Sequence, residues 1–335
     1  MQSLSLKIFV KDGELVMLEH KPYLLLNGLK EIAKEFKGTE NIFLGIKPYG
    51  FHAGNKIPFV AYPMLLCEEL EKNNKKAQFH FFVFLNDWEQ TRFDPEKTNW
   101  KEYPFNVIPQ FTTFQFSKDP SHNVNYWEHV IYSSVQEVQM RFPNVSIQCI
   151  RNSSMRDLPI MKEVVLKTIQ NPDLLGNIMQ NLGFPLHKSF PYTYCNPICP
   201  KCTSARTQAK VIDPDNIDLV CPDCSYHGTH SYHDLYYWLY HKILALPRIK
   251  YYDIDLCISG LDHYKERDFD SRYALYQAYN INMKPTYILY TPALHGINGL
   301  QMGKSRQNCA DIPTDKLIEL IKNHPNVYEL YMEGR

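Results

Sequence analysis

Short apolar runs alternate with longer amphipathic segments along most of this chain of 335 residues. The runs at 42–46 and 79–85 predict buried strands, whereas segments 59–70 and 125–142 have the periodicity of helices. Strands that alternate with helices are typical of a parallel sheet. We therefore expect an α/β fold built on such a sheet, whose first half begins at about residue 41.

The same alternation continues to the end of the chain. We expect strands at 146–150, 253–258 and 286–290, and helices at 23–36, 160–182, 233–246, 268–279 and 314–323. Three units are expected. They are residues 1–190 with the first half of the sheet, residues 191–232 as an insertion, and residues 233–335 with the second half of the sheet and a C-terminal helix.

The insertion carries the strongest motif in the chain, two Cys-x2-Cys pairs separated by 18 residues. The four cysteines are Cys199, Cys202, Cys221 and Cys224. Each pair places two thiolates on one tight turn, and two such turns complete a tetrahedral shell around zinc. Disulfides are the competing interpretation, but the N-terminus has no secretory pattern, and an intracellular thiol stays reduced. Four thiolates leave no open position, so the predicted zinc is structural.

Composition limits the location and the partners of the chain. With 44% hydrophobic and 21% charged residues, the chain can bury a full core. No apolar run approaches the roughly 20 residues that a membrane helix needs, and we expect a cytoplasmic protein.

Charge gives a weaker indication of partners. The formal net charge is zero, with 36 acidic and 36 basic side chains, so no broad positive field predicts nucleic-acid binding. Six basic residues nevertheless occur in and after the cysteine segment: Lys201, Arg206, Lys210, Lys242, Arg248 and Lys250. They would suit contact with the acceptor end of an RNA, or they form an ordinary solvated surface. The sequence leaves both interpretations open.

A glycine-bearing turn follows the first predicted strand. Residues 47–55 read Lys-Pro-Tyr-Gly-Phe-His-Ala-Gly-Asn and lead towards the predicted helix at 59–70. Gly50 and Gly54 let the backbone come close to a ligand, the helix N-terminus favours negative charge, and His52 can donate to a phosphate. The segment indicates a phosphate-binding corner, with a simple turn as the alternative.

A second short segment, 301–308, reads Gln-Met-Gly-Lys-Ser-Arg-Gln-Asn. Lys304 and Arg306 would lie in a loop with Gly299 and Gly303 nearby, so that a cationic segment could close over a polyphosphate. A cation there can stabilise the charge that develops as pyrophosphate leaves. The alternative is a solvated basic loop.

In this order along the chain, the two segments resemble the HIGH and KMSKS signatures of class I aminoacyl-tRNA synthetases. The greatest similarity is to the class I lysyl-tRNA synthetases, whose first motif commonly ends in Asn. The family's first-motif histidine, glycine and last position fall on His52, Gly54 and Asn55. In the second motif, Lys304 takes the place of the family's second lysine.

The second motif departs from the family at Gln301 and Gly303, which replace its first lysine and its serine. The resemblance implies a Rossmann-like catalytic domain of class I synthetase type with an inserted zinc ribbon, and it implies that ATP is bound with Mg²⁺. It implies catalytic roles for His52, Asn55 and Lys304. The nucleotide-binding residues that it implies are Gly50, His52, Gly54, Asn55, Gly260, Asp262, His263, Met302, Lys304 and Ser305.

Another polar turn, Gly260-Leu261-Asp262-His263, follows the predicted strand at 253–258 and resembles the corresponding turn of the same family. By that resemblance Gly260 packs under the adenosine, Asp262 contacts the ribose hydroxyls or the bound amino acid, and His263 lines the pocket. A carboxylate at the carboxyl end of a parallel strand suits such a role. The alternative is that Asp262 only caps a helix.

The family has an acidic cluster after its second strand, and Asn86 and Asp87 fall at that position, after the run 79–85. Asp87 is the candidate to meet the amino group of a bound amino acid. An amide at Asn86, where an acid is common, would reduce the negative charge of the pocket. The alternative is an ordinary turn at the end of a strand.

The resemblance covers roughly residues 40 to 310, the catalytic half of the family, and we expect no counterpart of its helical anticodon-binding domain. The expected function is ATP-dependent activation of an amino acid, with lysine as the first candidate, and transfer to the 3′ end of a tRNA. Two alternatives stay open. The activated amino acid could pass to a small molecule, a protein or a modified base, or the chain could be a non-catalytic RNA-binding or regulatory protein.

Overall fold

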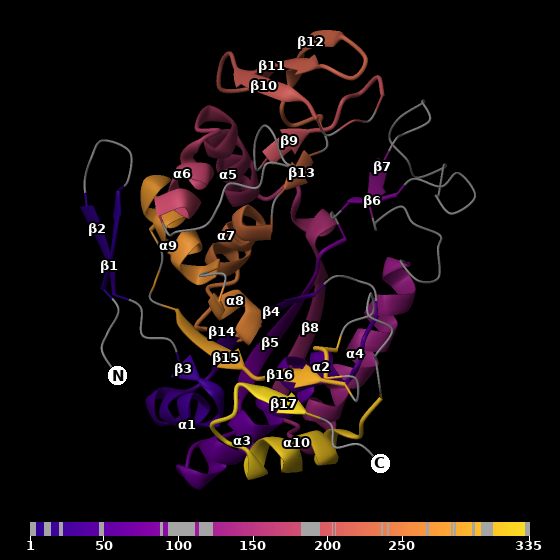
Figure 1. The fold of residues 1–335 in the computed structure, drawn as a ribbon. Helices are drawn as coiled ribbons and strands as arrows, with labels where there is room; N and C mark the ends of the chain where they lie inside the picture. The colour runs from indigo at the N-terminus through magenta and orange to yellow at the C-terminus, as the bar shows by residue number, and fades with distance from the viewer. Residues whose placement is uncertain are drawn as a thin grey trace.

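The computed structural model describes residues 5–9, 15–19, 23–46, 50–87, 90–92, 111–113, 123–181, 195–202, 204, 206–235, 237–239, 241–265, 268–282, 284, 286–296, 299–302 and 311–331. Its centre is a sheet of six strands in which every neighbouring pair is parallel (Figure 1). In sheet order the strands are β3 (Tyr23–Leu24), β15 (Tyr287–Thr291), β14 (Leu256–Gly260), β4 (Glu40–Ile46), β5 (Phe79–Leu85) and β8 (Val145–Arg151). The predicted α/β fold with a parallel sheet is confirmed.

The strand order reverses in the middle of the sheet. From β4 the chain adds β5 and β8 on one side, and from β14 it adds β15 on the other side. β4 and β14 are themselves paired, with Ile42 opposite Leu256 and Phe43 opposite Cys257. This is the doubly wound, Rossmann-like arrangement, in which ligands bind beyond the carboxyl ends of the strands at the reversal point.

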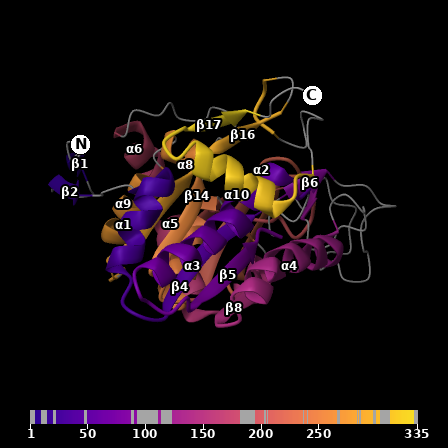
Figure 2. The ribbon, with the colours of Figure 1, turned by 90° about the horizontal axis from the view of Figure 1, so that it is seen from below.

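Helices cover both faces of the sheet. One face carries α1 (Leu25–Glu35), α3 (Tyr62–Lys72), α4 (Val124–Arg141) and α10 (Thr314–Asn323), as Figure 2 shows. The other face carries α5 (Pro159–Gln170), α6 (Leu174–Asn181), α7 (His241–Tyr251) and α9 (Asp268–Ala278).

The strand residues alternate between the two cores, as the pleat of a sheet requires. Ile42 and Leu44 of β4 pack in the core under α1 and α3, whereas Phe43 packs in the core under α7. Both faces of the central strands are therefore buried, which explains why β5 reads Phe-His-Phe-Phe-Val-Phe-Leu with little alternation.

Two predicted helices have different bounds. The helix expected at 160–182 is divided into α5 and α6, because Pro172 disfavours helical geometry at Asn171. The helix expected at 233–246 is wrong in its first part, where β13 (Tyr237–Leu239) pairs antiparallel with β9 (Cys195–Pro197). Only the last part of that prediction falls in α7, which continues to Tyr251.

Smaller elements surround the sheet. The cysteine segment forms an antiparallel ribbon of β10 (Gln208–Val211), β11 (Asn216–Cys221) and β12 (Tyr226–Ser231), which lies at the top of Figure 1. β16 (Ala293–His295) and β17 (Glu329–Tyr331) form a parallel pair near the C-terminus. Two further antiparallel pairs lie outside the sheet, β1 (Ser5–Phe9) with β2 (Leu15–Glu19) and β6 (Gln90–Arg92) with β7 (Phe111–Thr113).

The bounds of the three predicted units, 1–190, 191–232 and 233–335, stay predictions. Within the part of the chain that the structure describes, no helix has both the length and the apolar character to cross a membrane.

Candidate functional site

The predicted phosphate-binding corner joins β4 to a short helix, α2 (Ala53–Lys56). Gly50 has a φ of 69°, in the left-handed region that glycine adopts without strain. His52 caps α2, because its Nδ1 accepts a hydrogen bond from the backbone N of Gly54 at 3.2 Å. In return, Oδ1 of Asn55 accepts from the backbone N of His52 at 3.2 Å. This reciprocal capping fixes the residues that the sequence assigned to the phosphates.

The hydrogen bond of the cap also determines which ring nitrogen of His52 carries the proton. Nδ1 accepts a hydrogen bond, so the neutral ring carries its proton on Nε2. Burial lowers the pKa of His52 from its ordinary value of 6.5. At neutral pH, His52 therefore offers one N–H donor, at Nε2, and no charge.

The start of the second motif lies against this corner. Met302 is 6% exposed, and its backbone N donates to the carbonyl of Leu294 at 2.7 Å. A Cβ added at Gly54 would lie 3.6 Å from Cβ of Met302. Figure 1 shows β16, which leads to this segment, beside α2. Lys304 and Ser305 lie outside the described residues, as do Gly303 and Arg306.

The third predicted turn follows β14, the strand paired with β4. Gly260 is the last residue of β14, and the carboxylate of Asp262 occupies the space where a side chain on Gly260 would project. Asp262 is exposed and is the second residue of α8 (Leu261–Lys265), so it does not sit at the N-cap position of that helix. His263 is half-buried in the same helix. The turn and the corner at His52 therefore follow neighbouring strands.

Asn86 and Asp87 follow β5, the other neighbour of β4. Asp87 is completely buried, and it accepts from the backbone N of Ser153 at 3.0 Å and from Oγ of Ser153 at 2.5 Å. Burial raises the pKa of Asp87. Both carboxylate oxygens of Asp87 thus bind the turn that follows β8. The binding of a substrate amino group by Asp87 stays a prediction.

Asn86 contacts two residues that the sequence did not assign to the site. Its Oδ1 accepts from Nη2 of Arg248 at 2.7 Å and from Nδ2 of Asn152 at 3.1 Å. Arg248 is 3% exposed, and its guanidinium lies 5.4 Å from the ring centre of Phe84. The signal in the sequence was an arginine among the apolar residues of α7, where positions 243–246 and 249 are buried.

The burial of Arg248 removes it from the basic surface that the sequence left open as an RNA contact or as an ordinary solvated surface. Arg206 forms an ion pair with Asp223 within the ribbon, and Lys250 donates to the carbonyl of Asn282. The side chain of Lys242 is outside the described part. Arg206, Arg248 and Lys250 therefore serve separate local contacts, whereas Lys201 and Lys210 are exposed.

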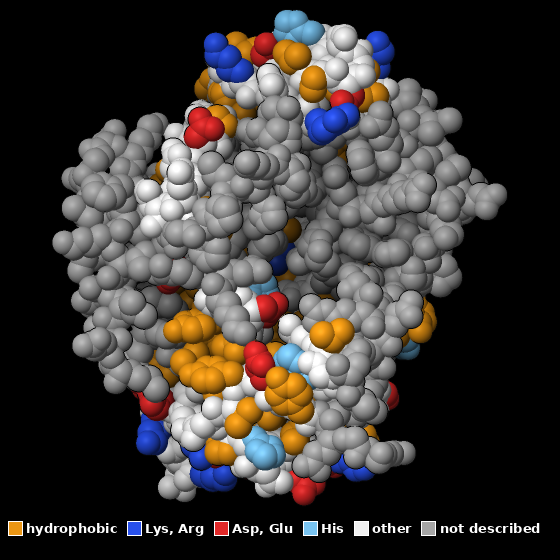
Figure 3. Space-filling model, viewed as in Figure 1, with side chains coloured by type: hydrophobic (Ala, Val, Ile, Leu, Met, Phe, Trp, Pro, Cys, Tyr) orange, Lys and Arg blue, Asp and Glu red, His pale blue; other side chains and the backbone are white. Residues whose placement is uncertain are grey.

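The space-filling view in Figure 3 shows a hollow near the centre of this face. It lies between the part of the molecule that carries α7 and β13 and the part that carries β16 and β17, and Lys or Arg, His and acidic side chains are visible around it. A concave site with convergent polar groups is the usual form of a small-molecule site.

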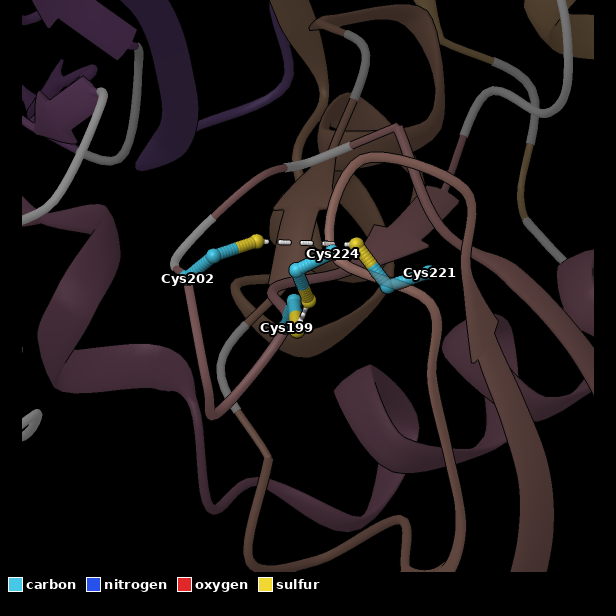
Figure 4. Close-up of side chains that lie close together, drawn as sticks. All are labelled: Cys199, Cys202, Cys221 and Cys224. Atoms are coloured by element: carbon cyan, nitrogen blue, oxygen red, sulfur yellow. Dashed lines mark hydrogen bonds between the residues drawn. The ribbon is translucent and has the colours of Figure 1, made fainter.

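The four cysteines of the ribbon come together as predicted. Their Sγ atoms all lie within 4.8 Å of one another, with 3.7 Å between Cys199 and Cys224 and 3.6 Å between Cys202 and Cys221. Figure 4 shows the four side chains directed at one point. An all-thiolate donor set of this size suits tetrahedral zinc.

The neighbouring histidines have other partners. Nε2 of His227 lies 2.8 Å from Oδ1 of Asp218, and Nε2 of His230 lies 2.7 Å from the hydroxyl of Tyr226. The candidate metal ligands in the described residues are the four cysteines.

No family model matches this chain, and no curated protein matches it either. Among solved structures, it is similar to a tyrosyl-tRNA synthetase complexed with L-tyrosine from Archaeoglobus fulgidus, with 13% identity and a TM-score of 0.41 over 87% of this chain and 66% of that chain. It is also similar to a glutamate-tRNA synthetase from Elizabethkingia anophelis, with 12% identity and a TM-score of 0.35 over 80% of this chain and 53% of that chain. The chain thus spans less than two thirds of both proteins.

Proposed function

We propose that this chain is an ATP-dependent enzyme of the class I aminoacyl-tRNA synthetase type, which activates an amino acid by forming its adenylate. One observation carries the proposal. The corner at His52 and the turn at Gly260 follow β4 and β14, the paired strands at which the strand order reverses. Doubly wound sheets bind nucleotides at this edge. Met302, the second residue of the second motif, packs against the same corner.

In the proposed complex, ATP lies along this edge with its phosphates beside α2. Nε2 of His52 donates to a phosphate oxygen, Asn55 supports that ring through the capping box, and Gly50 and Gly54 leave room for the nucleotide. The exposed carboxylate of Asp262 accepts from the ribose hydroxyls or from the amino acid. Gly260 and His263 complete the adenosine side of the site.

The reaction joins a carboxylate to the nucleotide. An oxygen of the amino acid's α-carboxylate attacks the α-phosphorus in line, the bond to the bridging oxygen breaks, and pyrophosphate leaves with the electron pair. Such a step needs positioning and charge stabilisation rather than a protein nucleophile. In this proposal Lys304 and Ser305 bind the leaving phosphates, and Mg²⁺ neutralises their charge.

The acceptor proposed for the activated amino acid is the 3′ end of a tRNA, in the cytoplasm. The resemblance of the two motifs to class I synthetases supports this acceptor. The same resemblance, without further support, is the basis for proposing lysine as the activated amino acid. The ribbon, held by zinc on its four cysteines, would have a structural role and take no chemical part.

A second candidate is transfer to an acceptor other than tRNA. The partners of two of the basic residues favour it, because Arg248 is buried against Asn86 and Arg206 is paired with Asp223. Side chains engaged in this way contribute less to the binding of a polyanion than free cations do. Comparing transfer of the activated amino acid to bulk tRNA with transfer to small amines would separate the two candidates.

The test of the proposed function is amino-acid-dependent exchange of pyrophosphate into ATP, measured with each of the twenty amino acids. We expect exchange with one amino acid or a closely related group, and a loss of about 10² to 10³-fold in His52→Ala, the usual effect of removing one donor at a developing charge. His80→Ala is the matched control, because His80 is exposed at the amino end of β5 and contacts Ser146.

No exchange with any amino acid, with or without added tRNA, would contradict the proposal. So would equal exchange by wild type and His52→Ala, because the corner would then take no part in the reaction.

A further inference from the structure

The second motif is attached to the rest of the fold at its first two residues. His295, the last residue of β16, forms an antiparallel bridge with Gln301, and the backbone N of Met302 donates to the carbonyl of Leu294. Met302 is buried and lies beside Gly54 of α2. The start of the motif is therefore fixed against this short helix.

A second attachment to α2 lies on the other side of the motif in the chain. Nζ of Lys56, the last residue of α2, donates to Oδ1 of Asp311 at 2.5 Å and to the carbonyl of Ile312 at 3.5 Å. The side chain of Lys56 is only 14% exposed, whereas that of Asp311 is 85% exposed. Lysine is seldom buried to this degree without a partner, and here Asp311 and Ile312 are its partners.

The chain that follows Asp311 is itself held firmly. α10 begins at Thr314, whose hydroxyl donates to Oε2 of Glu137 in α4 at 2.5 Å. Leu317 of the same helix is completely buried in the core. Lys56 therefore ties α2 to a well-packed part of the molecule, and the chain on both sides of residues 303–310 is attached to α2.

From these contacts we infer that Lys56 is a positioning residue for the proposed reaction: by binding Asp311, it sets where the second motif lies relative to His52. The inference rests on the proposed function, in which Lys304 binds the leaving phosphates. His52 caps the start of α2 and Lys56 ends it, so one short helix carries the phosphate donor and an attachment of the segment that includes Lys304. A reaction that depends on positioning is sensitive to such an attachment.

The test measures kcat and KM of pyrophosphate exchange in Lys56→Met, which keeps a long side chain and removes its charge. Because a misplacement of 1 Å can cost about 10²-fold in rate, we expect the smaller shift caused by losing one contact to lower kcat about tenfold. KM for the amino acid should stay unchanged. The thermal unfolding temperature should change little, because an ion pair with an exposed partner adds little to stability.

Two further variants serve as a rescue and a control. Lys56→Arg should restore most of kcat, because a guanidinium can donate to the same carboxylate of Asp311. Lys72→Met is the matched control and should keep the wild-type kcat. Lys72 ends α3, which leads to the amino end of β5, and its ion pair with Glu69 is of similar length, 2.6 Å.

Double variants show whether Lys56 acts through the second motif. Adding Lys56→Met to Lys304→Ala should cause no further loss of the residual kcat, because the residue that Lys56 positions is then missing. Asp311→Asn should also lower kcat, and Lys56→Met with Asp311→Asn should be no slower than Lys56→Met alone. A merely structural effect of Lys56 would instead multiply with both changes, and that result would overturn the inference.

The possible outcomes separate the two proposals. Wild-type kcat in Lys56→Met overturns the inference and leaves the proposed function intact. A higher KM for ATP with an unchanged kcat also overturns it, because Lys56 would then bind the nucleotide itself. No exchange by the wild-type protein with any of the twenty amino acids contradicts the proposed function and the inference together.

Discussion

Replacing Gly54 by alanine tests the corner at its most sensitive point. Gly54 is the second residue of α2 and donates its N–H to the ring of His52. A Cβ added there would lie 3.0 Å from Cε1 and 3.1 Å from Nδ1 of His52, and 3.6 Å from Cβ of Met302. The ring contacts are tighter than ordinary van der Waals contacts, so the ring must retreat by a few tenths of an ångström.

The magnitude of the effect should differ between stability and activity. Alanine in place of glycine within a helix gains about 1 kcal/mol, and weakening the cap costs about 1 kcal/mol, so the free energy of unfolding should hardly change. A misplacement of 1 Å can cost about 10²-fold in rate, so a smaller shift of the His52 ring should cost about tenfold, or about 1.4 kcal/mol of barrier.

The assay is pyrophosphate exchange at saturating ATP and amino acid, with thermal unfolding measured on the same samples. Gly38→Ala is the control, because a Cβ at Gly38 meets nothing within 4 Å. A Gly54→Ala enzyme with wild-type kcat would contradict this prediction, since the position of the His52 ring would then be irrelevant to the reaction.

Three further predictions concern other parts of the molecule. Because burial lowers the pKa of His52 and its neutral Nδ1 accepts the cap bond, the exchange rate should be constant above pH 6.5 and fall as acid protonates the ring. The residual activity of His52→Asn should not show this fall at acidic pH, and a fall that persists in the variant would belong to another group. Asp87→Asn leaves one acceptor for the two donors of Ser153, and it should lower the free energy of unfolding in urea by about 1 to 3 kcal/mol; unchanged stability would contradict the role of this contact. Purified protein should contain one zinc ion per chain by elemental analysis, lost in Cys221→Ser and kept in Cys67→Ala, whose thiol lies in the core; equal zinc content in both variants would contradict the ribbon site.

Local pattern was enough to predict much of the sheet. The strands expected at 42–46, 79–85 and 286–290 correspond to β4, β5 and β15, and the helix expected at 314–323 coincides with α10. Each of these elements is one uninterrupted stretch of sequence, and the spacing of its apolar residues is enough to predict which of its positions are buried. The cysteine cluster was predictable for a similar reason, because its two pairs have a spacing that fits a single metal.

Contacts between distant segments were not predictable. The strand at Tyr237–Leu239 exists because it pairs with Cys195–Pro197, about which the local pattern carries no information. Arg248 looked like one more surface cation, since nothing near it in the sequence indicates Asn86 as its partner. The same limit applies to the residues after β5, because the partners of Asn86 and Asp87 come from distant segments of the chain.

A crystal structure of the protein with Mg²⁺ and the non-cleavable analogue α,β-methylene-ATP would show where the nucleotide binds. We expect the nucleotide at the carboxyl ends of β4 and β14, with a phosphate oxygen within hydrogen-bond distance of Nε2 of His52 and the ribose beside Asp262. A nucleotide bound elsewhere on the molecule, with this edge of the sheet empty, would contradict it.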